Sequence, residues 1–315
     1  MGFRILLARE RGMCAGVDRA IRTVKTALSR YGAGRVFVLH EVVHNRHVVE
    51  GLRRDGAVFV ESLSEVPEGA VLIFSAHGVG SATEDEARSR ALTVIDATCP
   101  VVTAIHRKVA RASAEGADLV VIGHRGHQEV EGTIGRYLGN GSKVHVVLSP
   151  DDIESLELDP ENAVFATQTT LSVDETARTV EALRQRFPKI RGPRRDDTCN
   201  ATQLRQNAVR ELAAHCDLVY IAGSKNSSNS NRLREVAERE GVRALLVDDE
   251  SEINPDDLAG VSAVGVSAGA SAPEYVVAGI VGFLTSHGGS APEETGGAVA
   301  ERHFPLPRGL EDGAS

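Results

Sequence analysis

Three well-separated cysteines each stand at the predicted start of a helix. Cys14, Cys99 and Cys199 lie in GMCAGVDRAIRTVKTAL, DATCPVVTAIHRKVARA and DDTCNATQLRQNAVREL, where apolar residues recur at helical spacing. A helix N-terminus favours the thiolate, which is the metal-binding form of cysteine. Three thiolates suit a cubane iron–sulfur cluster whose fourth iron stays open to substrate. Zinc stays an alternative, although cysteines 85 and 100 residues apart lack the paired spacing of structural zinc modules.

The fourth cysteine has a different setting. Cys216 lies in AAHCDLVYIAG, directly ahead of a segment with the composition of a buried strand. A thiol there behaves as a small apolar side chain. We therefore expect Cys216 to be a core residue and not a ligand.

Polar loops follow short apolar runs at matching distances from the three cysteines. The runs 36–39, 119–122 and 218–221 lead into HEVVHN, GHRGHQE and GSKNSSNSN, and His40, His124 and Ser224 lie 26, 25 and 25 residues after their cysteines. A second strand and polar loop follow in each copy, near His77, Thr169 and Ser271. This order predicts an α/β fold of three similar domains, over residues 1–97, 98–197 and 198–285. The Gly-, Pro- and Glu-rich residues from 286 to 315 predict a flexible C-terminal tail.

The loops supply polar side chains that can bind an anion. Open parallel sheets bind ligands beyond the carboxyl ends of their strands, so the loops of three such units can converge on one site. Imidazoles, hydroxyls, an amide and helix N-terminal backbone groups together suit a diphosphate. The candidates are His44, His77, His127, Ser227, Ser228, Asn229 and Ser271. Any single serine among them can instead be a turn or cap residue. We expect His40, His47 and His124 to be structural.

Two further loop residues are candidates for proton transfer. Glu129 follows His127 at the start of a predicted helix, where its carboxyl group can donate a proton. Its neighbour Glu131 is an equal candidate on composition, and either can be an ordinary first-turn glutamate. Thr169 in TQTTLS can orient a water or relay a proton, and Thr170 has a similar claim.

The net charge, the lack of long apolar runs and the sequence context of one short motif exclude other classes of protein. The run HEVVH at 40–44 matches a zinc protease motif, but it follows a strand and contains two β-branched valines, so the required helix is missing. The net charge of −9 opposes nucleic-acid binding. No apolar run approaches the roughly 20 residues that span a bilayer, and none resembles a signal peptide. We therefore expect a cytoplasmic protein that binds neither nucleic acid nor membranes, with thiols instead of disulfides.

Long, ordered motifs extend over about residues 3–284. They are RGMCAGVDRAI, HEVVHN, FSAHGV, DATCP, GHQEVEGT, TQTTLSVDET, DDTCNAT, GSKNSSNSNRL and AGASAP. Together they closely resemble the 4-hydroxy-3-methylbut-2-enyl diphosphate reductases of the non-mevalonate isoprenoid pathway. The resemblance implies a pseudo-threefold trefoil of α/β domains around a central oxygen-sensitive [4Fe-4S] cluster, found as [3Fe-4S] after oxidation. It makes Cys14, Cys99 and Cys199 the cluster ligands and Glu129 the proton donor. Thr169 would lie beside the substrate hydroxyl, and the diphosphate contacts would be His44, His77, His127, Ser227, Ser228, Asn229 and Ser271.

The implied reaction is a reductive dehydroxylation. The open iron binds the allylic hydroxyl, Glu129 delivers the proton with which it leaves as water, and two electrons enter through the cluster. Protonation of the allyl species at either end then gives isopentenyl and dimethylallyl diphosphate. The electrons would come from an external donor such as ferredoxin or flavodoxin.

Three rival functions share some of these residues. One is a different three-cysteine cluster enzyme of similar architecture, such as quinolinate synthase, but the loops GSKNSSNSN and TQTTLS favour the reductase. A non-enzymatic iron–sulfur sensor would need an effector domain or a DNA-binding helix pair, and the sequence predicts neither. A zinc hydrolase is the third rival, and metal analysis separates it from the reductase.

Overall fold

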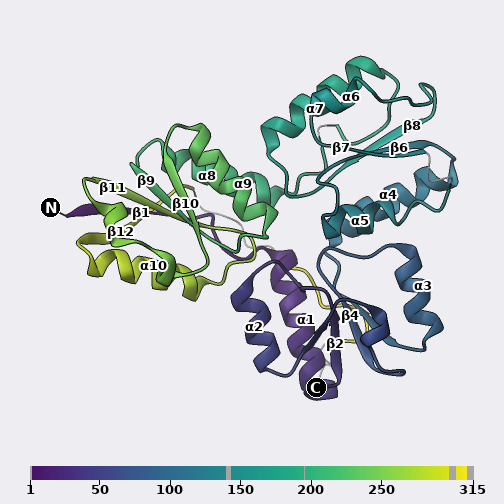
Figure 1. Ribbon diagram of the computed structural model, residues 1–315, viewed down its shortest axis with the longest axis horizontal. Helices are drawn as coiled ribbons and strands as arrows, with labels where there is room; N and C mark the ends of the chain where they lie inside the picture. Colours follow the sequence, from purple (N-terminus) through teal and green to yellow (C-terminus); the bar gives the residue numbers. More distant parts are fainter. Residues whose placement is uncertain (1, 140–142, 195, 298–302, 311–315) are drawn as a thin grey trace. The chain divides into compact units, whose positions relative to one another are not determined.

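The protein is described by a computed structural model that covers residues 2–139, 143–194, 196–297 and 303–310 (Figure 1). The strands are β1 (Phe3–Ala8), β2 (Val36–Leu39), β3 (Val58–Val60), β4 (Val71–Phe74), β5 (Thr93–Asp96), β6 (Asp118–Ile122), β7 (Val144–Val147), β8 (Ala163–Thr167), β9 (Leu218–Ala222), β10 (Arg243–Val247), β11 (Ala263–Ala268) and β12 (Gly289–Thr295). The α-helices are α1 (Ala15–Tyr31), α2 (Arg46–Arg54), α3 (Ser81–Ser89), α4 (Pro100–Ala114), α5 (Gln128–Ile134), α6 (Pro150–Ile153), α7 (Val173–Arg186), α8 (Asn200–Ala213), α9 (Ser228–Arg239) and α10 (Glu274–Ser286). Short 3-10 helices are η1 (Leu63–Glu65), η3 (Glu250–Glu252) and η4 (Pro255–Leu258).

The described strands form three sheets that share one topology. Their orders are β3-β2-β4-β5, β7-β6-β8 and β10-β9-β11-β1-β12, and all the strand pairs are parallel. In each sheet, one strand lies between the next two strands of the chain, as β6 lies between β7 and β8. Such a reversal of strand order creates the crevice where open α/β sheets bind ligands. The predicted α/β class is confirmed, with three similar sheets of parallel strands.

Two strands depart from the predicted units. β1 belongs to the first repeat in sequence but pairs with β11 of the third, and β12 pairs with β1. The prediction of a flexible tail from residue 286 is therefore wrong for Gly289–Thr295. β12 is an edge strand, and its polar side chains and Pro292 are tolerated there because one edge of the strand needs no partner.

A later part of the predicted tail is hydrogen-bonded to α1. Phe304 and Pro305 accept hydrogen bonds through their carbonyls from Arg22 and Arg19 of α1, at 2.8 and 2.7 Å. Leu310 is buried. The residues between β12 and this segment, 298–302, and the last five of the predicted tail, 311–315, lie outside the described residues.

The described chain groups into two compact units. Unit 1 consists of Met1–Asp18, Val43–Gly51 and Asn200–His303, and unit 2 of Arg19–Val42, Leu52–Cys199 and Phe304–Ser315. The predicted limits of the three repeats, at residues 97, 197 and 285, stay predictions.

Each unit has its own apolar core. In unit 1 the five-stranded sheet is covered on one face by α10 and on the other by α8 and α9 (Figure 1). In unit 2 the sheet β7-β6-β8 carries α6 and α7 on one face and α4 and α5 on the other. The central strands β6 and β9 are buried along their whole length, which explains their continuous apolar sequences. Among the described helices, none has the length and apolar character to cross a membrane.

Candidate functional site

In the second repeat, the loops that follow β6 and β8 lie side by side. The backbone N–H of Gln168, just past β8, donates to the Ile122 carbonyl at the end of β6, at 2.8 Å. The Gln168 side chain accepts from the backbone N–H of His124 at 3.0 Å. These bonds join the two polar loops of this repeat at the carboxyl ends of neighbouring strands, where the sequence predicted a site.

Glu129 and Thr169 form a buried pair between these two loops. One carboxylate oxygen of Glu129 accepts from the backbone N–H of Thr169 at 2.6 Å, and the other accepts from its hydroxyl at 2.8 Å. Glu129 is only 3% exposed and Thr169 is 6% exposed. Both carboxylate oxygens are therefore held by one residue of the loop after β8, which fixes the orientation of the group.

The histidines of unit 2 lie next to this pair. His127 caps the N-terminus of α5, and its Nδ1 accepts from the backbone N–H of Glu129 at 3.1 Å. Its ring lies edge-to-face with that of His77, with centroids 6.0 Å apart. The Nδ1 atom of His77 lies 3.2 Å from the Ser75 hydroxyl. Unit 2 therefore brings His77, His127, Glu129 and Thr169 together.

Backbone hydrogen bonds tie the two cysteines of unit 2 to the same loops. The N–H of Cys199 donates to the Thr169 carbonyl at 3.1 Å. The N–H of Cys99 donates to the carbonyl of Ala76, the residue before His77, at 3.0 Å. Cys99 is the N-cap of α4, and Cys199 directly precedes α8. Each cysteine thus occupies the predicted helix start.

The candidate residues of unit 1 lie in loops that are hydrogen-bonded to one another. The backbone N–H of Cys14 donates to the Ala270 carbonyl at 3.1 Å, and the N–H of Ala270 donates to the Asn229 side chain at 2.8 Å. The Ser271 hydroxyl donates to the His44 carbonyl at 2.9 Å. Unit 1 therefore connects Cys14 with the loops that follow β9 and β11.

The start of α9 presents buried polar groups. Ser227 is its N-cap and accepts from the backbone N–H of Ser230, and Ser228 is the first residue of the helix. The Asn229 side chain is buried, and its amide nitrogen has no hydrogen-bond partner in the described chain. A buried donor without a partner costs about 1–3 kcal/mol, so its retention at a helix N-terminus points to an anionic ligand.

Arg205 is a positioning residue that sequence reasoning missed. Its buried guanidinium donates to the Gly12 carbonyl at 2.9 and 2.7 Å and to the Glu10 carboxylate at 2.9 Å. It thereby holds the loop before Cys14 against α8. The only sequence signal is a lone charged residue on the apolar face of a predicted helix, at TQLRQ.

The structure separates the alternatives that composition left open. The Glu131 carboxylate accepts from the backbone N–H of Gly126 at 3.0 Å, which is the ordinary bond of a first-turn glutamate. The Thr170 hydroxyl accepts from the Gln168 side chain at 2.9 Å. Residues 40–44, HEVVH, form no helix, and α2 begins only at Arg46. The predicted absence of the zinc protease helix is confirmed.

Comparison with known proteins decides the family. The LytB protein family matches residues 5–285. The chain belongs to the LytB family. It is 53% identical to the 4-hydroxy-3-methylbut-2-enyl diphosphate reductase of Methylococcus capsulatus, over 97% of this chain and 98% of that one. Its identity to the protein of the same name from Hahella chejuensis is 55%, over 98% and 97%.

Solved structures agree with the LytB assignment. The structure of E-1-hydroxy-2-methyl-but-2-enyl-4-diphosphate reductase from Plasmodium falciparum superposes with a TM-score of 0.92, at 32% identity, and covers 98% of this chain and 97% of that one. A second solved structure is described as (E)-4-hydroxy-3-methyl-but-2-enyl diphosphate reductase, the terminal enzyme of the non-mevalonate pathway. Its TM-score is 0.63 at 32% identity, over 91% of this chain and all of that one.

Three of the four cysteines of this LytB chain have the local setting of thiolate ligands. Cys14, Cys99 and Cys199 are partly exposed thiols, and each directly precedes a helix. Cys216 packs in the core between the sheet of unit 1 and α8, and burial, with the nearby Asp217 charge, raises the pKa of its thiol to about 12. The structure thus separates three candidate ligands from one core thiol.

Proposed function

We propose that this chain catalyses the reductive dehydroxylation of 4-hydroxy-3-methylbut-2-enyl diphosphate to isopentenyl and dimethylallyl diphosphate, the last step of the non-mevalonate pathway. The names of its curated relatives support this reaction. The observation that carries it is the buried Glu129 carboxylate, held by Thr169, whose carbonyl in turn binds the N–H of Cys199. A fixed carboxyl group beside a thiolate ligand is what coupled proton and electron delivery requires.

Three residues hold the redox group in this proposal. Cys14, Cys99 and Cys199 would bind one [4Fe-4S] cluster, which could be found as [3Fe-4S] after oxidation. When bound, the cluster would pass two electrons from the external donor to the substrate, one at a time, and would supply an iron that no protein residue ligates as a Lewis acid for the allylic hydroxyl. Cys216 takes no part because its thiol stays protonated in the core.

Glu129 is the proton donor in this proposal. The reaction consumes two electrons and two protons for each allylic alcohol reduced, and it releases one water. Glu129 delivers the proton that leaves with the hydroxyl, and the second proton ends on the allylic carbon. Thr169 holds the carboxyl group in place through its hydroxyl and its N–H. It lies beside the substrate hydroxyl in this arrangement.

The proposed diphosphate contacts are polar loop side chains. They are His77 and His127 in unit 2, and His44, Ser227, Ser228, Asn229 and Ser271 in unit 1. The buried Asn229 amide nitrogen and the N-terminal end of the 12-residue helix α9 support an anion here. Neutral donors and helix dipoles can bind a diphosphate although the chain as a whole is acidic.

An external one-electron donor such as ferredoxin or flavodoxin completes the reaction. We place the chain in the cytoplasm, because its four cysteines are thiols and a reducing compartment keeps them so.

The cofactor is tested by iron and acid-labile sulfide analysis of protein purified without oxygen. We expect about three to four irons per chain with matching sulfide. Cys99→Ser should lower both, whereas the matched control Cys216→Ser should leave both unchanged. Zinc without sulfide would contradict the proposal and favour a hydrolase, and a full, stable cluster in Cys99→Ser would remove Cys99 from the ligand set.

The proton donor is tested by Glu129→Gln. The amide keeps the shape of the side chain but has no acidic proton, so we expect the cluster and the substrate affinity to persist while most turnover is lost. The control is Glu131→Gln, which alters the neighbouring first-turn glutamate. Normal turnover in Glu129→Gln would remove Glu129 from the mechanism.

A further inference from the structure

The turn that carries His77 lies directly against a buried histidine of α4. Gly78, the next residue, has a φ of +77°, and its N–H donates to the Ser75 carbonyl at 3.2 Å. A Cβ atom on Gly78 would lie 2.5 Å from Cε1 of His106 and 3.0 Å from the methyl group of Thr98. The backbone of this turn therefore has no room to move toward α4 while the His106 ring stays in place.

Helix α5 closes the opposite side of the same turn. A Cβ atom on Gly132 would lie 2.9 Å from the Gly78 carbonyl oxygen, so the two backbones are in contact. The N–H of Ser81, at the start of α3, donates to the Gly135 carbonyl at 2.9 Å. The turn is thus held between the His106 ring and the helix that carries Glu129.

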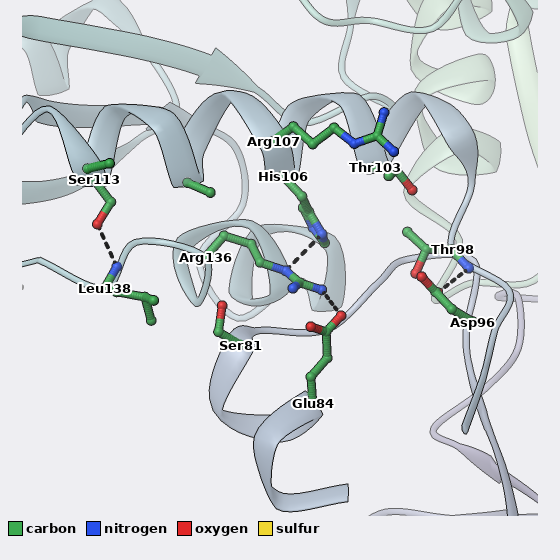
Figure 2. Close-up of a pocket in the computed structure, with 12 residues that line it drawn as sticks. Ser81, Glu84, Asp96, Thr98, Thr103, His106, Arg107, Ser113, Arg136 and Leu138 are labelled. Carbon is green, nitrogen blue, oxygen red and sulfur yellow. Dashed lines mark hydrogen bonds and ion pairs between the residues drawn. The ribbon is translucent and has the colours of Figure 1, made fainter. Parts of the chain in front are cut away.

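Hydrogen bonds to the neighbouring elements fix the His106 ring (Figure 2). The Arg136 Nε donates to Nδ1 of His106 at 3.2 Å, and the same guanidinium pairs with the Glu84 carboxylate at 2.5 Å. Because an arginine only donates, Nδ1 must be unprotonated. Burial, with the charge of Arg136, lowers the pKa of His106 to about 4, so the ring is neutral at pH 7.

Packing alone does not hold the ring. A cavity of about 400 Å³ lies beside the ring and is lined by His106 itself and by Glu84, Ser113 and Arg136 among others (Figure 2). His106 is 5% exposed, and its Nε2 atom has no hydrogen-bond partner in the described chain. An apolar side chain of similar size would avoid that unpaired group. The feature that only a histidine adds here is a rigid ring with an acceptor for Arg136.

We propose that His106, fixed by Arg136 and Glu84, is a positioning residue that holds the His77 turn and thereby sets the affinity for the diphosphate of the substrate. This inference rests on the proposed function, in which His77 contacts the diphosphate. His106 itself touches neither substrate nor cluster in this arrangement. It acts through the backbone of Gly78.

The test compares His106→Leu with His106→Asn in the cluster-loaded enzyme. Leucine nearly fills the site but accepts no hydrogen bond, so we expect the KM to rise about tenfold while kcat stays within about twofold. Asparagine places an acceptor near the position of Nδ1, so the KM should return most of the way to the wild-type value. Iron content per chain should be the same in all three proteins.

A milder variant guards against misfolding at this buried position. Glu84 is partly exposed, and Glu84→Gln weakens its hold on Arg136 without touching the core, so we expect a KM rise of about two- to fivefold. The matched control is Asp85→Asn on the same helix, because Asp85 pairs with the exposed Arg88 at 2.7 Å and with no other cation of the described residues. Asp85→Asn should leave the KM unchanged.

Calorimetric titration with inorganic diphosphate gives a readout that does not depend on turnover. We expect His106→Leu and Glu84→Gln to bind diphosphate more weakly than the wild type, in the same order as their KM values. An unchanged KM and unchanged diphosphate affinity in both variants, or a fall in kcat with no change in KM, would overturn the inference while the wild type remains active. A wild-type enzyme that loads its cluster and converts no substrate would instead overturn the proposed function.

Discussion

The Thr169 hydroxyl offers a precise test of how the carboxyl group of Glu129 is held. Thr169→Val keeps the shape and the β-branched backbone preference of threonine but removes the 2.8 Å hydrogen bond to Glu129. The backbone N–H of residue 169 still reaches the other carboxylate oxygen. Leaving one buried acceptor without its partner costs about 1–3 kcal/mol. If the bond forms its full strength only as Glu129 gives up its proton and becomes charged, that cost falls on the transition state and lowers kcat by about 5- to 150-fold.

The assay is steady-state turnover under anaerobic conditions, with the iron content measured on each preparation. Thr169→Ser restores the hydroxyl and should recover most of the rate. Thr170→Val is the matched control, because the Thr170 hydroxyl accepts a hydrogen bond from the Gln168 side chain. A Thr169→Val enzyme with a full cluster and a kcat within twofold of the wild type would refute the role of this bond.

Three further predictions follow from buried groups. Arg205→Met leaves the Glu10 carboxylate and the Gly12 carbonyl without their cation, so the free energy of unfolding of the cluster-free chain in urea should fall by about 3 kcal/mol. Arg210→Met on the same helix should lower it by less than about 1 kcal/mol. Equal losses of stability in the two variants would contradict the role of Arg205. Alkylation of the cluster-free chain at pH 8 should modify Cys14, Cys99 and Cys199 but spare Cys216, whose pKa is raised to about 12; peptide mass spectrometry checks this, and rapid labelling of Cys216 would disprove its burial. The pKa of His106 falls from 6.5 in the unfolded chain to about 4 in the fold, so the contribution of the neutral ring to the free energy of unfolding is complete above pH 6.5 and is lost as the pH falls toward 4, by up to about 3 kcal/mol. The free energy of unfolding measured over that range should depend less on pH in His106→Leu than in the wild type. An identical pH dependence would contradict the lowered pKa of His106.

The sequence predicted the elements that bear local signals. The three helices after Cys14, Cys99 and Cys199 were found because apolar spacing and a polar start identify a helix without knowledge of its neighbours. The strands ahead of the polar loops were found for the same reason, since a short apolar run flanked by turn residues reads as a buried parallel strand. Because the same elements recur in each repeat, the three sheets are expected to share one strand order, as they do.

Features that depend on distant partners could not be predicted. β12 is Gly- and Pro-containing and mostly exposed, and it is a strand only because β1 offers a free edge to pair with. Arg205 and His106 carry no local motif, and their roles are visible only once Gly12 and Gly78 lie against them. Composition could not rank Glu129 above Glu131 either, since the difference is the contact with Thr169, 40 residues further along the chain.

The most direct test of the account is to supply 4-hydroxy-3-methylbut-2-enyl diphosphate and a chemical one-electron reductant to the anaerobically purified, cluster-loaded protein and to identify the products. We predict that isopentenyl and dimethylallyl diphosphate both form, with two electrons consumed for each substrate converted. A protein with a complete iron–sulfur cluster that binds the diphosphate but leaves its hydroxyl group in place would contradict the account.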